Sequence, residues 1–311
     1  MSALSPLSQI LNFLRNNALH QKDYGTSFEY LCLDFLKNKP EYKVQFVEVL
    51  PYGGWVETYH KHIQEEYGVV LNRQDKGIDL VAKDTDGKFT AVQCKFYEEN
   101  HTVAKSEIDS FIAASEKVYF VRRLVFVTGK INKNVQEEVQ HLPIPLHFIG
   151  RYDLENSRFD WQNYLDNLRN PQTKGSLKDK KELREYQRQA VNSVKQGLEN
   201  ADRGKMIMAC GTGKTFTALK IAEEMAGLGK TVLFLVPSLS LLDQTISEWV
   251  QNSALPLNLW AVCSDSEVSK KKASELNADD YAISDLSELQ YPATTDAKQL
   301  SLSFHHKLSS L

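Results

Sequence analysis

The sequence has 311 residues and a formal net charge of −3, with 42% hydrophobic and 25% charged residues. The length exceeds one ordinary domain and fits two, and the composition is that of a globular protein. A near-neutral charge excludes a basic field over the whole surface as the means of attracting nucleic acid, but it does not exclude a local basic groove.

The four cysteines are far apart in the sequence and form no Cys-x-x-Cys pair, so neither a metal knuckle nor a dithiol redox motif is expected. They are Cys32, Cys94, Cys210 and Cys263. A signal peptide needs a basic start and a continuous apolar stretch, and the N-terminus has neither. No apolar run is long enough to cross a bilayer. We therefore expect a cytoplasmic protein with no membrane partner.

Residue patterns in the first half predict a mixed α/β domain with an antiparallel pair near its middle. The expected helices cover residues 26–37, 55–67 and 132–142, and the expected strands cover 43–50, 117–129 and 144–150. Between them, residues 79–96 read as two strands joined by a turn. The fold class expected for this half is therefore mixed α/β.

The second half follows a Pro-, Gly-, Ser- and Lys-rich stretch that reads as a basic linker. Apolar strands at 205–209, 230–237 and 257–264 then alternate with helices at 213–229 and 240–250. This alternation predicts a parallel sheet covered on both faces, as in a partial RecA-like, P-loop domain. The predicted limits are 1–167 for the first domain, 168–182 for the linker and 183–311 for the second domain, whose tail from Ser264 is polar and poorly patterned.

The hairpin at 79–96 carries a first candidate site. A two-residue turn would pair Asp79 with Cys94, whereas a three-residue loop at 85–87 with a left-handed Gly87 pairs Asp79 with Gln93. The second register places Asp79, Gln93 and Lys95 on one face. The opposite face is then apolar throughout, with Ile78, Leu80, Ala82, Val92, Cys94 and Phe96.

A carboxylate, an amide oxygen and a lysine in one place suit hydrolysis of a phosphodiester. The oxygens can bind Mg²⁺, which activates water and offsets charge on the phosphate, while the lysine stabilises the developing negative charge. The segments "GTSFEYL", "GID" and "QCK" resemble the Mrr-like branch of the PD-(D/E)xK nucleases over about residues 20–165. The resemblance implies a restriction-endonuclease-like domain with a mixed sheet. It also implies that Asp79 binds metal, that Gln93 shapes the metal site and that Lys95 is the catalytic lysine.

Glu29 has two readings of equal standing. The same resemblance makes it an auxiliary acid of the nuclease site. Thr26-x-x-Glu29 also fits a capping box, in which the Glu29 carboxylate would only accept the Thr26 backbone N–H.

Residues 211–215, Gly-Thr-Gly-Lys-Thr, carry a second candidate site, because they follow a predicted strand and open a predicted helix. In a phosphate-binding loop, Gly211, Thr212 and Gly213 wrap the phosphates of ATP, Lys214 reaches the β- and γ-phosphates, and Thr215 binds Mg²⁺. Met208 stands where the strict motif has Gly. The form "ACGTGKT" instead resembles superfamily 2 helicases.

Two flanking segments resemble further motifs of that superfamily. In "LREYQRQAV", Gln187 would read the adenine edge, or it is an exposed helix glutamine. In "VLFLVPSLSLLDQTISEW", Ser238 would contact a DNA phosphate, with a helix N-cap as the simpler role. The segment "TTD" adds Thr294 as a DNA contact. No DEAD- or DEAH-type box follows, although a motor needs such a carboxylate.

A Mrr-like nuclease followed by a superfamily 2 lobe resembles the N-terminal part of Type ISP restriction-modification enzymes. The resemblance implies Mg²⁺- and ATP-dependent restriction of foreign double-stranded DNA, with this chain a fragment. The rest of the motor, a methyltransferase and a target-recognition region would follow. Two alternatives stay open: a nuclease–helicase of repair or another defence system, and a non-catalytic remnant that binds DNA or nucleotide.

Overall fold

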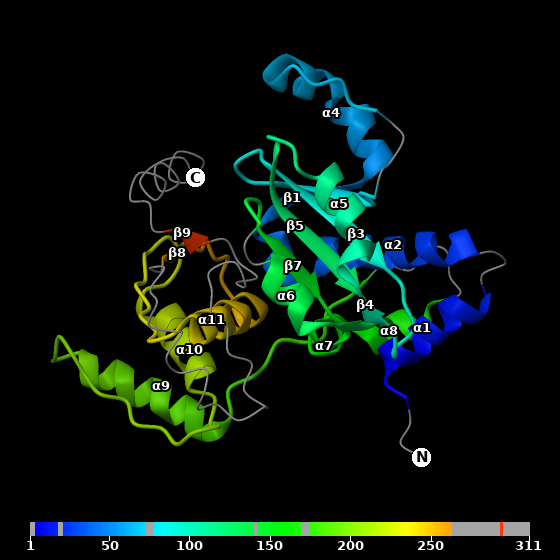
Figure 1. Ribbon diagram of the computed structural model, residues 1–311. Coiled ribbons are helices and arrows are strands. Elements are labelled where there is room, and N and C mark those ends of the chain that lie inside the picture. Colours follow the sequence, from blue (N-terminus) through cyan, green and yellow to red (C-terminus); the bar gives the residue numbers. More distant parts are fainter. Residues whose placement is uncertain are drawn as a thin grey trace. The chain divides into compact units, whose positions relative to one another are not determined.

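The computed structural model describes residues 4–17, 21–72, 77–139, 142–168, 175–262 and 293–294. The chain divides into two compact units, Met1–Lys178 and Asp179–Leu311 (Figure 1). Each unit has its own buried apolar cluster, as expected for two domains. No helix in the described ranges is long and apolar enough to cross a membrane.

The first unit is built on a five-stranded mixed sheet with the strand order β1-β2-β3-β5-β7. β1 (Phe46–Pro51), β2 (Leu80–Asp84) and β3 (Phe89–Lys95) are antiparallel, whereas β5 (Phe120–Val127) and β7 (Leu146–Ile149) continue parallel to β3. β3 is therefore the central strand. A separate two-stranded parallel sheet pairs β4 (Thr102–Val103) with β6 (Lys130–Ile131).

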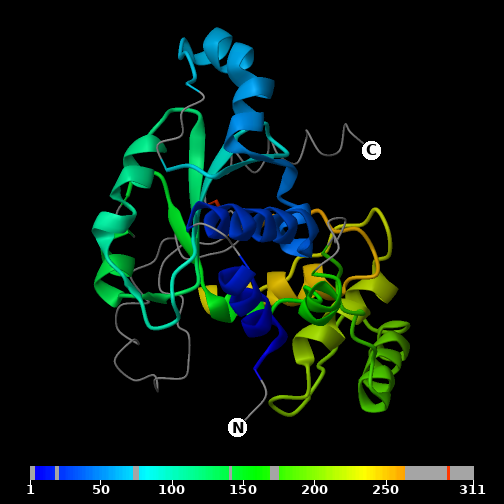
Figure 2. The ribbon, with the colours of Figure 1, turned by 90° about the vertical axis from the view of Figure 1, so that its right-hand side faces the viewer.

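Helices cover both faces of this sheet, and each face buries its own apolar cluster. One cluster joins the sheet to α1 (Pro6–Asn17), α2 (Gln21–Asn38), α3 (Pro40–Lys43), α7 (Arg151–Glu155) and α8 (Trp161–Asp166). The other joins it to α4 (Tyr52–Tyr67), α5 (Asp109–Ala114) and α6 (Lys133–Val139). The short helix η1 (Lys105–Glu107) precedes α5. α4 extends beyond the edge of the sheet in both views (Figures 1 and 2).

The predicted hairpin register is confirmed. Leu80 pairs with Val92 and Lys83 with Phe89, and Asp84 N–H donates to Lys88 O at 2.9 Å, which leaves a three-residue loop. Gly87 in that loop has φ +83°, a left-handed conformation that favours glycine. The three-residue bend thus fixes which residues of β2 and β3 face one another.

The predicted alternation of faces is wrong at Ile78, because the backbone bulges at the start of β2. Asp79 N–H donates to Val92 O at 2.9 Å, although Val92 is already opposite Leu80. Two residues facing one is the pattern of a β-bulge, which re-aims side chains. Ile78 consequently joins the cluster that contains Val81, whereas Leu80 joins the other.

The second unit is mainly helical in its described part. α9 (Glu185–Leu198), α10 (Lys214–Met225) and α11 (Leu239–Asn252) surround a cluster of Phe216, Leu219 and Trp249. A two-residue parallel pair joins β8 (Ala261–Val262) to β9 (Ala293–Thr294). The helices match the predicted alternation, since α10 and α11 fall within one or two residues of their expected starts.

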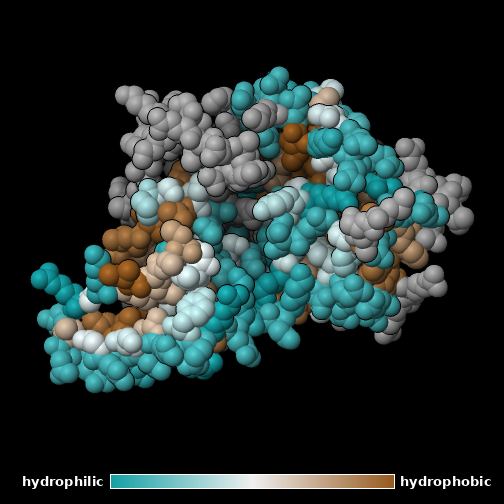
Figure 3. Space-filling model, turned by 90° about the horizontal axis from the view of Figure 1, so that it is seen from below, coloured by the Kyte–Doolittle hydropathy of each residue, from teal (hydrophilic) through white to brown (hydrophobic). Residues whose placement is uncertain are grey.

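The strands predicted at 205–209 and 230–237 are absent from the described structure of this unit. Their apolar side chains are exposed, with 82% exposure for Ile207, 82% for Leu233 and 81% for Leu235. Figure 3 shows brown, apolar surface on this unit. An apolar run becomes a strand only when a neighbour supplies ladder hydrogen bonds, and among the described residues these two runs have no such neighbour.

Candidate nuclease site and nucleotide pocket

The bulge at the start of β2 directs the Asp79 carboxylate to the central strand. Its Oδ2 accepts the backbone N–H of Cys94 at 2.6 Å. Cys94 stands between Gln93 and Lys95, so the predicted acid contacts the strand segment that carries the predicted amide and lysine. A carboxylate that accepts a backbone N–H is held in one orientation.

Glu29 lies on α2, near the same segment. α2 begins at Gln21, so Thr26 is inside the helix and does not cap it, and the capping-box reading is wrong. Burial raises the pKa of the Cys94 thiol well above its ordinary value, and the negative charges of Asp79 and Glu29 raise it further. Burial likewise raises the pKa of Cys32, and the same two carboxylates contribute. Two acids from different elements thus converge beside this thiol pair.

Gln93 is buried, with 4% exposure, and its amide is oriented by the backbone. Its Nε2 donates to Gly77 O at 2.9 Å, whereas its Oε1 has no hydrogen-bond partner among the described residues. A buried amide oxygen without a donor is costly. A cation is one kind of partner that would satisfy it.

Gly77 makes this arrangement possible. It has φ +106°, and a Cβ on it would lie 3.3 Å from Gln93 Nε2 and 3.3 Å from Ser110 Oγ. A larger residue would therefore be strained and would crowd the amide. The sequence analysis predicted no role for Gly77, although a glycine at a strand can indicate close backbone approach.

Lys95 is the last residue of β3, where it pairs with Val127 of β5. It is partly buried, and its carbonyl accepts Thr128 N–H at 3.2 Å. The pairing with β5 therefore fixes the backbone of Lys95. Gln93 and Lys95 lie in β3, and Asp79, which directly precedes β2, contacts the backbone between them through Cys94 N–H.

The oxygen atoms of this region fit a hard cation better than a soft one. No group of three or more His, Cys, Asp or Glu side chains in the described ranges is arranged to hold a metal ion. Beside Cys94 the oxygen donors are the Asp79 and Glu29 carboxylates, and Gln93 of the same strand carries an unpaired Oε1. Carboxylate and amide oxygens are ligands for Mg²⁺, which also keeps several waters.

The glycine-rich loop of the second unit has the backbone of a phosphate-binding loop. Gly211 and Gly213 have φ +74° and +78°, both left-handed. Gly213 is the N-cap of α10, so Lys214 and Thr215 are its first two residues. The loop therefore presents backbone N–H groups and the positive end of a helix dipole to a phosphate.

Lys214 lies against its own loop. Its Nζ donates to Ala209 O at 3.0 Å and to Met208 O at 3.4 Å, and its side chain is exposed. The Thr212 hydroxyl also donates to Ala209 O, at 2.7 Å. These carbonyl contacts hold the ammonium close to the loop, where a phosphate would replace neutral oxygen partners with charged ones.

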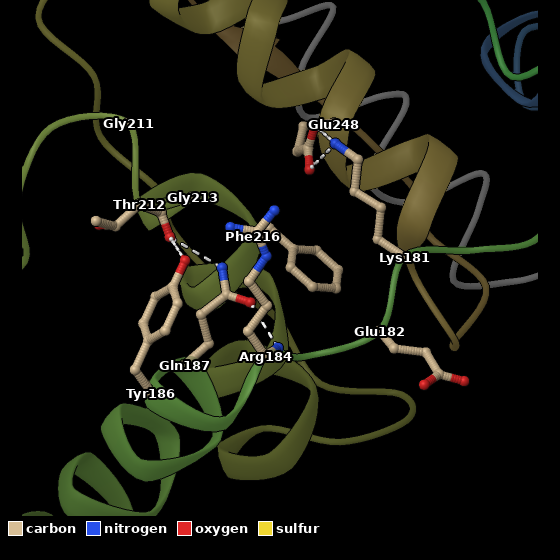
Figure 4. Close-up of a pocket in the computed structure, with 10 residues that line it drawn as sticks. All are labelled: Lys181, Glu182, Arg184, Tyr186, Gln187, Gly211, Thr212, Gly213, Phe216 and Glu248. Carbon is tan, nitrogen blue, oxygen red and sulfur yellow. Dashed lines mark hydrogen bonds and ion pairs between the residues drawn. The ribbon is translucent and has the colours of Figure 1, made fainter.

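Gln187 is not the exposed glutamine of the simpler reading, because it is 5% exposed. Its Nε2 donates to Thr212 O at 2.9 Å, and its Oε1 accepts Arg184 N–H at 3.0 Å. Tyr186 Oη donates to the same Thr212 carbonyl at 3.2 Å (Figure 4). Gln187 thus links the start of α9 to the glycine-rich loop.

A pocket of about 350 Å³ opens between these elements. Figure 4 shows Arg184, Gln187 and Phe216 grouped beside the loop, and the Lys181–Glu248 ion pair above them in this view. The pocket lining is Lys181, Glu182, Arg184, Tyr186, Gln187, Gly211, Thr212, Gly213, Phe216 and Glu248. The sequence reading did not include Arg184, Tyr186 or Phe216, although the first two flank Gln187 in the quoted motif.

The two predicted DNA contacts of this unit have different positions. Ser238 is the N-cap of α11, and its side chain accepts Leu241 N–H at 3.3 Å, so the capping role is confirmed. Its exposed position leaves it accessible. Thr294 belongs to β9 and pairs with Val262. The neighbouring Thr295 and Asp296 lie outside the described residues.

Comparisons with known proteins match both units. Residues 37–170 match the Mrr_cat_2 family of restriction endonucleases, and residues 180–308 match the ResIII family, described as the res subunit of Type III restriction enzymes. No curated protein sequence matches the chain.

Solved structures that match this chain include two Type ISP enzymes. The first is the ATP-dependent Type ISP restriction-modification enzyme LlaBIII bound to DNA, with 33% identity, a TM-score of 0.68, and coverage of 95% of this chain and 17% of that one. The second is a nuclease-deletion mutant of the Type ISP enzyme LlaGI with a DNA substrate mimic, with 40% identity over 42% of this chain and 12% of that one. The TM-score of this second match is 0.32.

The chain thus spans about a sixth of the length of LlaBIII. Glu29 lies before residue 37, the first residue that the endonuclease family matches. Residues 37–170 thus match a restriction endonuclease domain and residues 180–308 a ResIII domain, in a chain that is similar to part of a Type ISP restriction-modification enzyme.

Proposed function

We propose that the first unit hydrolyses phosphodiester bonds of double-stranded DNA with Mg²⁺. The observation that carries this proposal is the unpaired, buried Gln93 Oε1 beside the strand segment that Asp79 contacts. Asp79, Gln93 and Glu29 would hold the metal. Bound there, Mg²⁺ would lower the pKa of a water molecule and offset the phosphate charge.

The remaining steps belong to this chain's own side chains. Lys95 places an ammonium at the end of β3, where it would stabilise negative charge on the attacking oxygen and on the phosphate. Asp79 is fixed by Cys94 N–H, so the carboxylate needs no reorganisation when the substrate arrives. This pre-orientation favours the transition state over the free reactants.

We further propose that the second unit binds ATP through Gly211, Thr212, Gly213, Lys214 and Thr215, with Thr215 at Mg²⁺ and Gln187 at the adenine. In a longer protein this unit would drive ATP-dependent movement along DNA, with Ser238 and Thr294 at the DNA backbone. The similarity to LlaBIII, which is bound to DNA in its structure, supports this reading. The limits 1–167, 168–182 and 183–311 remain our proposed domain boundaries.

The test of the nuclease is cleavage of supercoiled plasmid by the full chain with Mg²⁺, comparing wild type with Asp79→Ala, Gln93→Ala and Lys95→Ala. We expect the wild type to cut and Asp79→Ala and Lys95→Ala to lose at least about a hundredfold in rate. Ser106→Ala serves as a control, because this exposed residue lies outside the proposed set. Equal cleavage by all variants would refute the site.

The test of the nucleotide pocket is ATP binding measured by calorimetry. Lys214→Ala should weaken binding at least about tenfold, because a charge-assisted contact to phosphate is lost. Lys230→Ala, at an exposed lysine after α10, should bind as the wild type does. Binding that survives Lys214→Ala unchanged would refute the phosphate-binding role.

A further inference from the structure

The chain leaves the ladder of the central sheet directly after Lys95. β3 ends at that residue, so the next three residues are held by side chains from elsewhere in the first unit. Arg15 of α1 contacts all three. Its guanidinium carbon lies 4.7 Å from the centre of the Phe96 ring, it donates to Tyr97 O, and its Nε lies 3.4 Å from Glu98 Oε1.

Thr128 holds the same segment through other atoms. Its hydroxyl accepts Tyr97 N–H at 2.8 Å and donates to Tyr97 O at 2.6 Å, and its own N–H donates to Lys95 O at 3.2 Å. Thr128 is buried, with 2% exposure. The Tyr97 carbonyl therefore has two donors, Thr128 and Arg15, from two different elements.

The Phe96 ring extends this arrangement to the other proposed acid. Phe96 stacks on Phe28 of α2, with ring centres 5.0 Å apart and an angle of 12° between the rings. Phe28 is fully buried and directly precedes Glu29. Phe96, which follows Lys95, thus contacts Phe28, which precedes Glu29. Arg15 packs on the Phe96 ring.

We propose that Arg15 is a positioning residue for Lys95 and Glu29 in DNA cleavage; this rests on the nuclease function proposed above. The contacts to the Phe96 ring and the Tyr97 carbonyl carry the effect. The ion pair with Glu98 adds little, because that side chain is 77% exposed. A catalytic group that shifts by about 1 Å can lose up to about a hundredfold in rate.

A different role for an arginine near such a site is contact with a DNA phosphate, and the two roles predict different kinetics. A phosphate contact contributes to affinity and to its salt dependence, and its loss reduces the salt slope by about one. A positioning residue affects the rate at saturating DNA and leaves affinity unchanged. The Arg15 side chain is only 19% exposed, and its three contacts within the chain favour the second role.

The experiment compares wild type with Arg15→Ala and Arg15→Lys as full chains. Cleavage rates are measured at saturating plasmid with Mg²⁺, and DNA affinity is measured without Mg²⁺ at several salt concentrations. We expect Arg15→Ala to lose at least about tenfold in rate, with affinity within about twofold and an unchanged salt slope. Arg15→Lys should recover part of the rate, because an ammonium can also pack on the Phe96 ring.

Arg151→Ala is the matched control. Arg151 pairs with Glu99 of the same loop at 2.8 Å, but its other partners are Glu155 and Ser8, away from the Tyr97 backbone. We expect a wild-type rate. Phe96→Leu removes the ring that Arg15 and Phe28 share, and it should reproduce the loss seen in Arg15→Ala.

Amide hydrogen exchange supplies a readout independent of cleavage. Exchange over residues 94–100 should accelerate in Arg15→Ala and not in Arg151→Ala, while α1 stays docked through buried Leu7, Ile10 and Leu11. A wild-type rate in Arg15→Ala, beside an inactive Lys95→Ala, would overturn the inference, as would weaker DNA binding with a shallower salt slope. A wild type that does not cut would instead overturn the proposed nuclease function.

Discussion

The side-chain amide of Gln187 occupies the space into which any side chain at position 213 would project. A Cβ built on Gly213 would lie 2.6 Å from Gln187 Nε2, closer than real Cβ contacts allow. Gly213 also has φ +78°. The glutamine and the glycine therefore depend on each other, because the hydrogen bond from Gln187 to Thr212 O requires a residue without a side chain beside it.

Gly213→Ala should weaken ATP binding by about tenfold or more, because strain of one to three kcal/mol and the clash with Gln187 both distort the loop. Gly227→Ala is the matched control, since Gly227 has φ +75° but nothing within 4 Å of its Cβ position. Calorimetric titration with ATP measures both. Equal affinities in the two variants would contradict the argument.

Gly77→Ala should slow DNA cleavage by about tenfold or more at saturating DNA. The added Cβ would press on Gln93 Nε2 and Ser110 Oγ, so the amide would lose the orientation that leaves its oxygen unpaired. Gly87→Ala adds comparable backbone strain, with φ +83°, but its Cβ would meet only Lys83 Cε at 4.0 Å. If both variants lose the same activity, strain alone explains the effect.

His147 should make the first unit sensitive to acid. Burial lowers the pKa of its imidazole to about 3, and the Arg122 charge adds to the effect. The unfolded chain takes up a proton near the ordinary value of about 6.5, so stability falls as the pH drops from there toward 3. Between pH 7 and pH 5 the loss is about 2 kcal/mol.

His147→Gln should remove that part of the acid sensitivity. The free energy of unfolding, measured by denaturant titration at pH 7 and pH 5, should fall less in this variant than in the wild type. His60→Gln changes a histidine on the exposed side of α4 and should follow the wild type. Parallel pH curves for wild type and His147→Gln would show that this imidazole does not control acid unfolding.

Arg123→Met should destabilise the first unit by about 3 kcal/mol. Arg123 is 1% exposed and donates to Ser115 Oγ, Ile144 O and Ile112 O at 2.7, 2.8 and 3.2 Å. Methionine fills much of the volume but leaves these acceptors without their donor. Lys105→Met, at a half-exposed ion pair with Glu138, should leave the free energy of unfolding close to that of the wild type. Native-state hydrogen exchange in β5 measures both.

The hairpin shows how far sequence reasoning reaches. Gly87 and the apolar pattern were enough to predict the loop length and the pairing of β2 with β3, because both depend on local turn chemistry. The position of Ile78 was not predictable from alternation. The bulge at Asp79 depends on hydrogen bonds to Val92 across the sheet, which no run of neighbouring residues encodes.

The site residues divide along the same line. Lys214 and Gln187 could be proposed from the sequence because their motifs are local, and α10 begins at Lys214, where the motif requires a helix to begin. Arg15 and Gly77 were missed, because their contacts join segments about 80 and 16 residues apart. The prediction of strands at 205–209 and 230–237 was wrong for a related reason, because an apolar run does not specify the strand with which it pairs.

The central place of β3 has a consequence for heat inactivation. Two strands lie on each side of it in the order β1-β2-β3-β5-β7, so fraying at either border of the sheet leaves Gln93 and Lys95 paired. Local opening is easiest at borders and termini. Loss of DNA cleavage on heating should therefore coincide with unfolding of the entire unit. Residual activity after heating would then be proportional to the fraction of molecules that remain folded.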